Sequence, residues 1–164
     1  MNTEGYSIQN LVTDLRQVCR QFTDEREIVG AVRPLAHRAA LAKADWLEER
    51  MYNAEPTHGF GVYLLHEEPD HALAVLAVSW HPRRGTPPHD HGTWGVVAAV
   101  DGPEKNEFFE RIDDRSRRGY AELRKIGEKV CAPGDVVAMP RGVIHSVSNV
   151  TDGAPSPAKV IGRA

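Results

Sequence analysis

The stretch Gly134-Asp-Val-Val-Ala-Met-Pro140-Arg-Gly142-Val-Ile-His145-Ser-Val-Ser-Asn149 decides which fold we expect. Its two short apolar runs are typical of strands, because both are bounded by residues that favour turns. Gly134 makes the turn before the first run, and Pro140 and Gly142 build the bend before the second. This bend delivers His145, a ring that can ligate a metal, to the start of the second strand.

The chain after Pro56 has the same texture, with short apolar runs broken about every ten residues by Gly, Pro, Asp or Asn. The predicted strands are Phe60–Leu65, Leu73–Trp80, Thr93–Val100, Glu107–Ile112, Ala121–Ile126, Asp135–Met139 and Ile144–Val150. Short strands at such even spacing indicate a sandwich or a small barrel.

The first third of the chain is predicted to be helical. From Ile8 to Phe22 the apolar residues recur at the spacing of one helical face. A second helix follows from about Asp24 with Thr23 as a possible N-cap, and Pro34 is expected to separate it from a third piece that runs to Met51. We therefore expect residues 1–55 to form a helical segment that packs on a barrel formed by residues 56–164.

Length and charge limit the possible functions. A chain of 164 residues fits one domain, and 20 basic against 23 acidic residues give a net charge of −3 with no basic run. A nucleic-acid partner is therefore not expected. The first ten residues lack the basic and apolar regions of a signal peptide, and the apolar stretch at Ala72–Trp80 is far shorter than the ~18 residues of a membrane span. We expect a cytoplasmic protein that has no membrane partner and is a monomer or a homodimer.

His89 and His91 form the second feature that points to chemistry. On an extended strand, residues at i and i+2 project from one face, as two ligands of one metal must. Neutral imidazole is a common ligand of first-row transition metals, and His145 from a distant strand would complete a facial set of three. A His-x-His pair in a histidine-rich chain is also compatible with two solvated loop residues.

The spacing around these histidines resembles the two motifs of the cupin superfamily. The quoted stretch matches the second motif at its Gly, Pro, Gly, His and Asn positions. The first motif begins with His-x-His and ends at a glycine held here by Gly102, but its glutamate position is Gly95. The resemblance implies a mostly β fold, the cupin double-stranded β-helix or jelly-roll barrel, with an N-terminal helical segment. Without the glutamate, a metal would keep three neutral ligands and open positions that favour an anion and dioxygen.

The segment Trp80-His-Pro-Arg-Arg-Gly-Thr-Pro-Pro-His89-Asp-His91-Gly-Thr-Trp94-Gly-Val96 resembles the metal-binding signature of the cysteine dioxygenase type I family, which includes the 3-mercaptopropionate dioxygenases. The similarity covers about residues 60–149. It implies one Fe(II) per chain, or another divalent metal, held by His89, His91 and His145. The implied activity is a thiol dioxygenase that oxidises a small thiol to a sulfinic acid with O2.

Two candidate substrate-binding residues follow from this resemblance. Family members place an Arg or Gln at the position of Tyr63, and a phenol cannot form the bidentate pair that a guanidinium offers a carboxylate. The substrate class therefore stays open. Trp94 is a second candidate for the substrate pocket, although an aromatic residue in a strand is more often part of the core. No catalytic residue is assigned beyond the metal ligands.

The family's Ser-x-His-x-Tyr segment has no counterpart, because the chain contains neither His nor Tyr after His145. Pro155 and Pro157 also make a central strand in the tail doubtful. The alternative prediction is therefore a metal-binding cupin module without oxygenase turnover. A third possibility is another divalent metal used for isomerase-type or hydrolytic work.

Overall fold

The computed structural model describes residues 5–153 and 156–162. In these ranges helices come first and strands follow. The helical elements are α1 (Ile8–Gln21), α2 (Glu25–Leu41), and the 3-10 turns η1 (Lys43–Asp45) and η2 (Glu49–Tyr52). The strands are β1 (Phe60–Glu67), β2 (Ala74–Trp80), β3 (Gly95–Ala99), β4 (Glu104–Arg111), β5 (Leu123–Cys131), β6 (Val136–Met139), β7 (Ile144–Asn149) and β8 (Ser156–Gly162).

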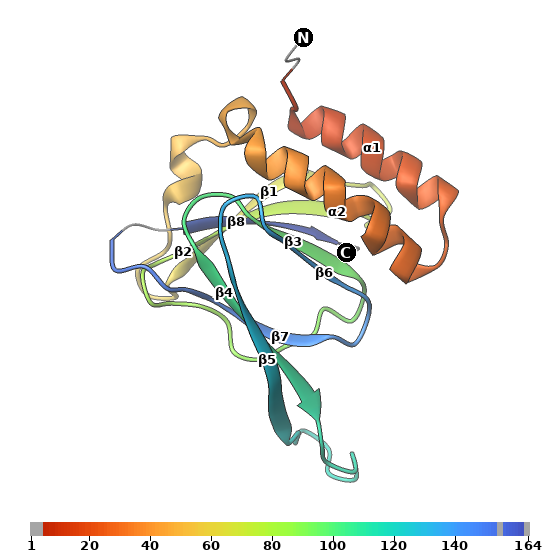
Figure 1. Cartoon of the computed structure of the whole chain (residues 1–164), viewed down its shortest axis with the longest axis vertical. Helices are drawn as coiled ribbons and strands as arrows, with labels where there is room; N and C mark the ends of the chain where they lie inside the picture. The colour runs from red at the N-terminus through yellow and green to blue at the C-terminus, as the bar shows by residue number, and fades with distance from the viewer. Residues whose placement is uncertain (1–4, 154–155, 163–164) are drawn as a thin grey trace.

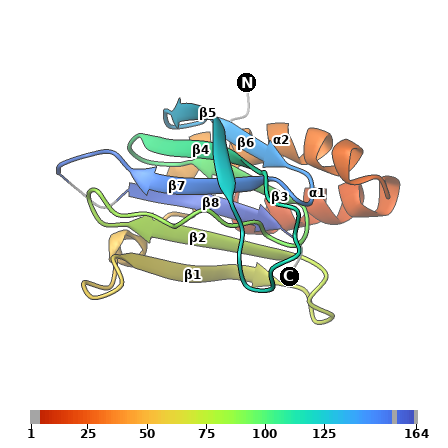
Figure 2. The same ribbon diagram turned by 90° about the horizontal axis from the view of Figure 1, so that it is seen from below.

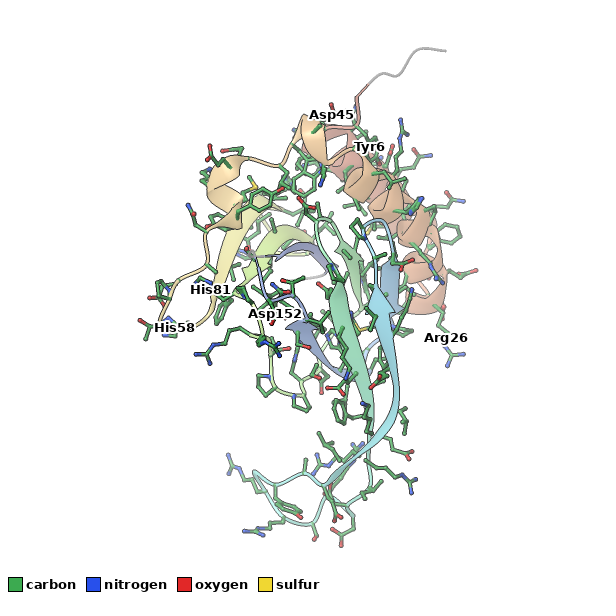
Figure 3. The ribbon with its side chains drawn as sticks, turned by 60° about the vertical axis from the view of Figure 1, so that its left-hand side comes forward. Tyr6, Arg26, Asp45, His58, His81 and Asp152 are labelled. Carbon is green, nitrogen blue, oxygen red and sulfur yellow. The ribbon has the colours of Figure 1, made fainter. Side chains whose placement is uncertain are left out.

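The two helices begin at side-chain caps. Ser7 forms a capping box at the start of α1, and Asp24, rather than Thr23, caps α2 by accepting from two backbone N–H groups. Pro34 does not separate two helices, as the sequence had predicted, but lies inside α2. The buried apolar side of α2 explains this, since tertiary packing outweighs the one hydrogen bond that a proline removes. In Figure 3, Tyr6 lies beside Asp45, whose carboxylate accepts from the Tyr6 backbone N–H at 2.8 Å.

The strands form two antiparallel sheets, as expected for a jelly roll. The larger sheet has the order β1-β2-β8-β3-β6, and the smaller sheet has the order β5-β4-β7. Figure 2 shows β7 and β4 lying across from β2 and β8, while the β4–β5 hairpin extends away from the helices in Figure 1. The mostly β prediction with an N-terminal helical segment is confirmed.

The tail corrects one expectation. β8 is a central strand between β2 and β3, although it contains Pro157. Pro157 is paired with β2 but not with β3. Along β8, the pairing with β3 begins at the next residue, Ala158. Proline is tolerated there because it stands near the start of the strand, where one neighbouring strand is absent. Pro155 lies outside the described residues.

Strands β4 and β5 start or end several residues from their predicted limits. Most charged residues of these strands face solvent and several pair across the hairpin, for example Lys125 with Glu107; Glu104 is buried. Because the apolar pattern is absent from that face, the sequence indicated only parts of both strands. β4 therefore begins at Glu104 rather than at Glu107.

The larger sheet separates two regions of the interior. Its outer face packs on α1 and α2 in one large apolar cluster, which includes Leu15, Val32 and Val96. Its inner face meets the smaller sheet in two smaller clusters, one around Met139 and one around Trp80. The space between the sheets is where the polar side chains described next are buried. No helix in the described ranges has the length and apolar character needed to cross a membrane.

Candidate metal centre

The three histidines come from two segments that are hydrogen-bonded to each other. His145 is the second residue of β7, while His89 and His91 lie in the irregular segment between β2 and β3 and not on the regular strand we expected. The backbones of His89 and His145 exchange two hydrogen bonds of 2.9 Å, which fix this segment along β7. Because this segment runs beside β7, the side chains of His89 and His91 still reach the point to which His145 extends.

Glycine allows this close approach. A Cβ on Gly85 would overlap the carbonyl oxygen of Val147, so only glycine fits where the segment first meets β7. Gly142 has φ +84°, in the left-handed region that the bend before β7 requires. The predicted roles of Pro140 and Gly142 in presenting His145 agree with this turn.

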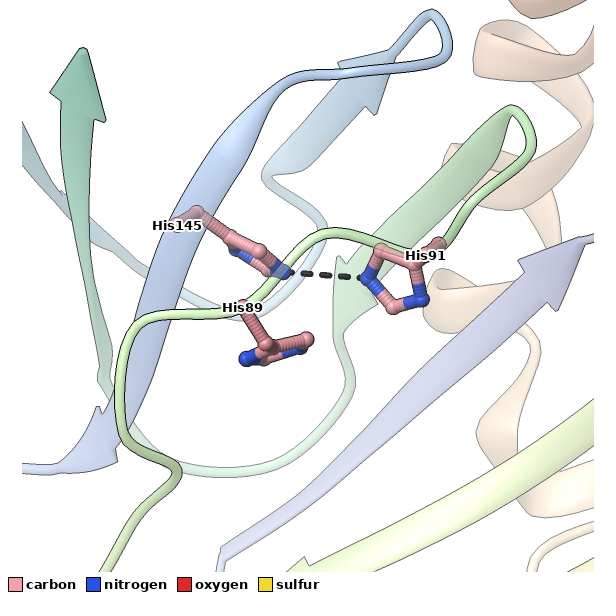
Figure 4. Close-up of side chains that lie close together, drawn as sticks. All are labelled: His89, His91 and His145. Atoms are coloured by element: carbon pink, nitrogen blue, oxygen red, sulfur yellow. Dashed lines mark hydrogen bonds between the residues drawn. The ribbon is translucent and has the colours of Figure 1, made fainter. Parts of the chain in front are cut away.

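The imidazole rings converge on one point (Figure 4). One nitrogen from each ring can be chosen so that all three lie within 4.8 Å of one another. The ring centroids are 4.7–5.3 Å apart, and the Nε2 atoms of His91 and His145 are 3.1 Å apart. No other group of His, Cys, Asp and Glu in the described ranges meets the same criterion.

The neighbours of two rings determine which nitrogen carries the proton. His89 Nδ1 lies 2.9 Å from the carbonyl oxygen of Pro87, which can only accept, so Nδ1–H is the donor. His145 Nδ1 lies 3.1 Å from Asn106 Oδ1 and donates to it for the same reason. Both rings therefore present an unprotonated Nε2, the atom that would bind a metal.

The electrostatics of the site favour neutral rings. Burial, followed by the charge of the neighbouring histidines, lowers the pKa of His145 to about 3, and burial and His89 lower the pKa of His91. Lone pairs of neighbouring Nε2 atoms repel each other unless a proton or a cation lies between them. A neutral three-nitrogen set therefore fits a divalent transition metal well.

The structure also explains the effect of Gly95 at the glutamate position. A Cβ built on Gly95 would lie 3.7 Å from the His91 ring, so a longer side chain there would begin beside the three histidines. With glycine, that side of the centre carries no ligand. The open coordination position expected from the sequence stays a prediction.

Two polar residues of β4 were not identified from the sequence. Asn106 is fully buried, bonds His145, and donates from Nδ2 to Glu104 Oε1 at 3.0 Å. Glu104 is 2% exposed, and burial raises its pKa to about 7. Because the predicted strand began at Glu107, both residues lay outside the predicted strands. Their spacing with Phe108, at every second position after Gly102, was the signal that could have identified them.

A small cavity of about 40 Å³ lies beside the histidines. Valine side chains form its apolar wall. Its polar lining includes one acidic residue, Glu104, so a carboxyl group lies in the cavity beside the histidines. The lining consists of Val78, Trp80, Thr86, His89, His91, Val97, Glu104, His145 and Val147.

The structure does not place Tyr63 and Trp94 in this cavity, which corrects the expectation that they line a pocket there. Tyr63 packs on the helix-side cluster and donates its hydroxyl to the carbonyl of Asn53 at 2.6 Å. Trp94 is 3% exposed in the same cluster. Side chains alternate between the two faces of a sheet, which explains both positions. Tyr63 is paired with Ala77, which faces the helices, and Trp94 is two residues from Val96, which also faces the helices.

Comparisons with known proteins give the fold. No family model matches the chain. The protein TT1209 from Thermus thermophilus is 18% identical over 70% of this chain and 91% of its own, with a TM-score of 0.53. An oxalate oxidase in complex with the substrate analogue glycolate is 20% identical with a TM-score of 0.52, over 72% of this chain. The match spans only 59% of the oxalate oxidase. A cupin superfamily protein from Desulfitobacterium hafniense is 14% identical over 63% of this chain and 76% of its own, with a TM-score of 0.46.

These likenesses concern the fold. The jelly-roll arrangement that the two motifs predicted is confirmed by the two antiparallel sheets and by the likeness in fold to TT1209 and the oxalate oxidase. The finer resemblance to thiol dioxygenases stays a prediction.

Proposed function

We propose that this protein is a non-haem Fe(II)-dependent thiol dioxygenase that converts a small thiol to its sulfinic acid. One observation carries the proposal. Three imidazoles converge on one point, and glycine stands at the position of the missing glutamate, Gly95, so no carboxylate extends from there. A metal held by three neutral ligands keeps its full positive charge, which favours an anionic thiolate as the next ligand.

Bound by His89, His91 and His145, Fe(II) would supply the redox chemistry that lets dioxygen react with a thiol. The overall reaction is R–SH + O2 → R–SO2H, so both oxygen atoms go to sulfur. Sulfur loses four electrons and dioxygen gains four, and no outside reductant is required. The thiol proton is accounted for in the acidic product.

The protein's own residues bind, orient and exclude water. Asn106 holds the His145 ring with its Nε2 toward the centre. The valine side chains of the cavity, including Val97 and Val147, keep bulk water from the reacting atoms. The small cavity volume fits a substrate with few heavy atoms.

Oxygen uptake tests the proposal. Protein loaded anaerobically with Fe(II) is mixed with air-saturated cysteine, 3-mercaptopropionate or cysteamine, and the product is analysed by mass spectrometry. We expect one of these thiols to give a sulfinate that retains both atoms of labelled O2. His145→Ala should show no uptake, whereas His58→Ala, at an exposed histidine, should match the wild type.

Bound iron without uptake for any thiol would instead support the metal-binding module. One observation favours that second candidate, because no tyrosine or further histidine lines the described cavity. Retention of another divalent metal in place of iron, with no oxygen uptake, would favour the third possibility, a centre for isomerase-type or hydrolytic work.

A further inference from the structure

Glu104 is a buried acid for which the proposed reaction gives no role. Its Oε1 accepts from Asn106, but its Oε2 is fully buried and has no hydrogen-bond partner within the part of the chain that the structure describes. The same residue lines the cavity beside the three histidines. A buried carboxyl group with an unsatisfied oxygen costs free energy unless an occupant of the cavity supplies a donor.

Trp80 presents the complementary group. Its indole N–H is buried without a partner among the described residues, and Trp80 is one of the residues that line the same cavity. The indole can only donate, whereas a carboxylate can only accept. An occupant that satisfies both side chains must therefore carry a strong donor and a separate acceptor atom, such as sulfur or oxygen.

No lysine or arginine is among the described residues that line this cavity. Arg83, in the segment between β2 and β3, pairs with Asp152, and Arg141, in the turn before β7, pairs with Glu25. A carboxylate on the substrate would therefore meet the acid Glu104 with no described lysine or arginine beside it, and only the metal at the three-histidine centre would offset the repulsion. A substrate ammonium would meet a carboxylate in an apolar, water-poor space, where charge-assisted hydrogen bonds are strong.

We infer that the substrate is a small aminothiol, whose ammonium group binds Glu104 while its sulfur lies at the three-histidine centre. The inference rests on the proposed function and narrows it to one substrate class. Glu104 is then a specificity-determining residue. The Trp80 N–H donates to the sulfur or to an oxygen of the sulfinate product.

Glu104→Gln is the informative variant. Glutamine keeps an oxygen that can accept from Asn106, so the support of His145 is retained while the negative charge is removed. Glu107→Gln is the matched control, because Glu107 lies on the same strand but faces solvent and pairs with lysines. Circular dichroism and iron content show whether each variant is folded and loaded.

The first measurement compares kcat/KM for cysteamine, 2-mercaptoethanol and 3-mercaptopropionate. These three thiols are similar in size, but they carry a positive, a neutral and a negative group. We expect the wild type to prefer cysteamine, and Glu104→Gln to lower kcat/KM for cysteamine by roughly tenfold or more, mainly through KM. The other two thiols should change little or improve. A wild type that prefers 3-mercaptopropionate, or a variant that affects all three thiols equally, would overturn the inference.

The second measurement does not require turnover. Calorimetric titration of the Fe(II)-loaded protein without oxygen gives the Kd of each thiol. Tighter binding of cysteamine that is lost in Glu104→Gln supports the inference even if no oxygen is consumed, in which case only the proposed dioxygenase activity fails. If oxygen is consumed and a thiol that carries a carboxylate is the preferred substrate, the dioxygenase activity stands and the aminothiol inference fails. Absence of cysteamine binding overturns the inference.

Discussion

The two faces of the five-stranded sheet are built from adjacent residues of the same strands but differ in character. On β3, Val96 and Ala98 face the helices, whereas Val97 and Ala99 face the smaller sheet. The outer face forms the large apolar cluster with α1 and α2. The inner region holds smaller apolar clusters and buried polar residues, among them Glu104, Asn106 and His145.

This difference indicates that the outer face mainly contributes stability, whereas the inner region contains the candidate site. The apolar packing of the outer face supplies stability without unsatisfied polar groups, because its side chains carry few. The inner region buries Trp80 Nε1 and Glu104 Oε2 without partners among the described residues. Burial of such groups lowers the stability of the fold, but it leaves them available to a bound ligand. Changes on the two sides should therefore affect different properties.

The largest effect on stability is expected from the outer face. Leu15→Ala removes a fully buried side chain of α1 and should lower the free energy of unfolding by about 2–5 kcal/mol. Metal affinity of the folded protein should stay unchanged, because Leu15 belongs to the helix-side cluster. Urea denaturation and metal titration measure the two quantities. Loss of metal affinity with unchanged stability would contradict the separation of the two regions.

Removal of the Glu104 charge should change how stability depends on pH. Burial raises its pKa in the folded state above the unfolded value of 4.5, so its favourable protonated form is lost as pH rises toward and through about 7. Without metal, the wild type should therefore lose about 3 kcal/mol relative to Glu104→Gln between low and neutral pH. The contribution of the histidines cancels in this difference. Equal pH profiles for both proteins would show that the folded protein does not hold Glu104 in an apolar environment.

A smaller effect is expected at Asn106, next to a proposed ligand. Asn106→Ala removes the acceptor of the His145 Nδ1–H and should weaken metal binding by roughly 10–100-fold. Lys105→Ala, on the exposed face of the same strand, serves as the control. Competition with a chelator gives both affinities. If the two variants bind metal equally well, Asn106 does not orient the ligand.

The smallest effect is expected on the β4–β5 hairpin, outside both regions. Arg124→Ala breaks an exposed ion pair with Glu110. Since solvent screens such a pair, we expect the unfolding free energy and the metal affinity to stay within experimental error. A clear loss of either would mean that the hairpin supports the site or the core.

The jelly-roll fold and the three histidines were accessible from the sequence because each depends on local signals. The Pro140–Gly142 bend and the alternating apolar strands specify turns and strands within a few residues. The spacing of His89 and His91 indicated a shared focus, although the segment is not a regular strand. Features that depend on distant partners were harder to recognise.

Three errors share that cause. The central position of β8 depends on pairing with β2 and β3, which no local pattern around Pro157 reports. The continuity of α2 through Pro34 depends on packing against the sheet. The third error concerns the face of the sheet that a strand residue occupies. Tyr63 lies on the face toward the helices, and Glu104 lies on a face that buries it beside the site.

The metal content of the three-histidine centre tests the central claim most directly. Metal-free protein is loaded with Fe(II) without oxygen, desalted and analysed for iron, with circular dichroism to confirm folding. We expect one iron per chain for the wild type and for His58→Ala, and no retained iron for a folded His145→Ala. Full retention of iron by His145→Ala would contradict the account, because the late-strand imidazole would then not hold the metal.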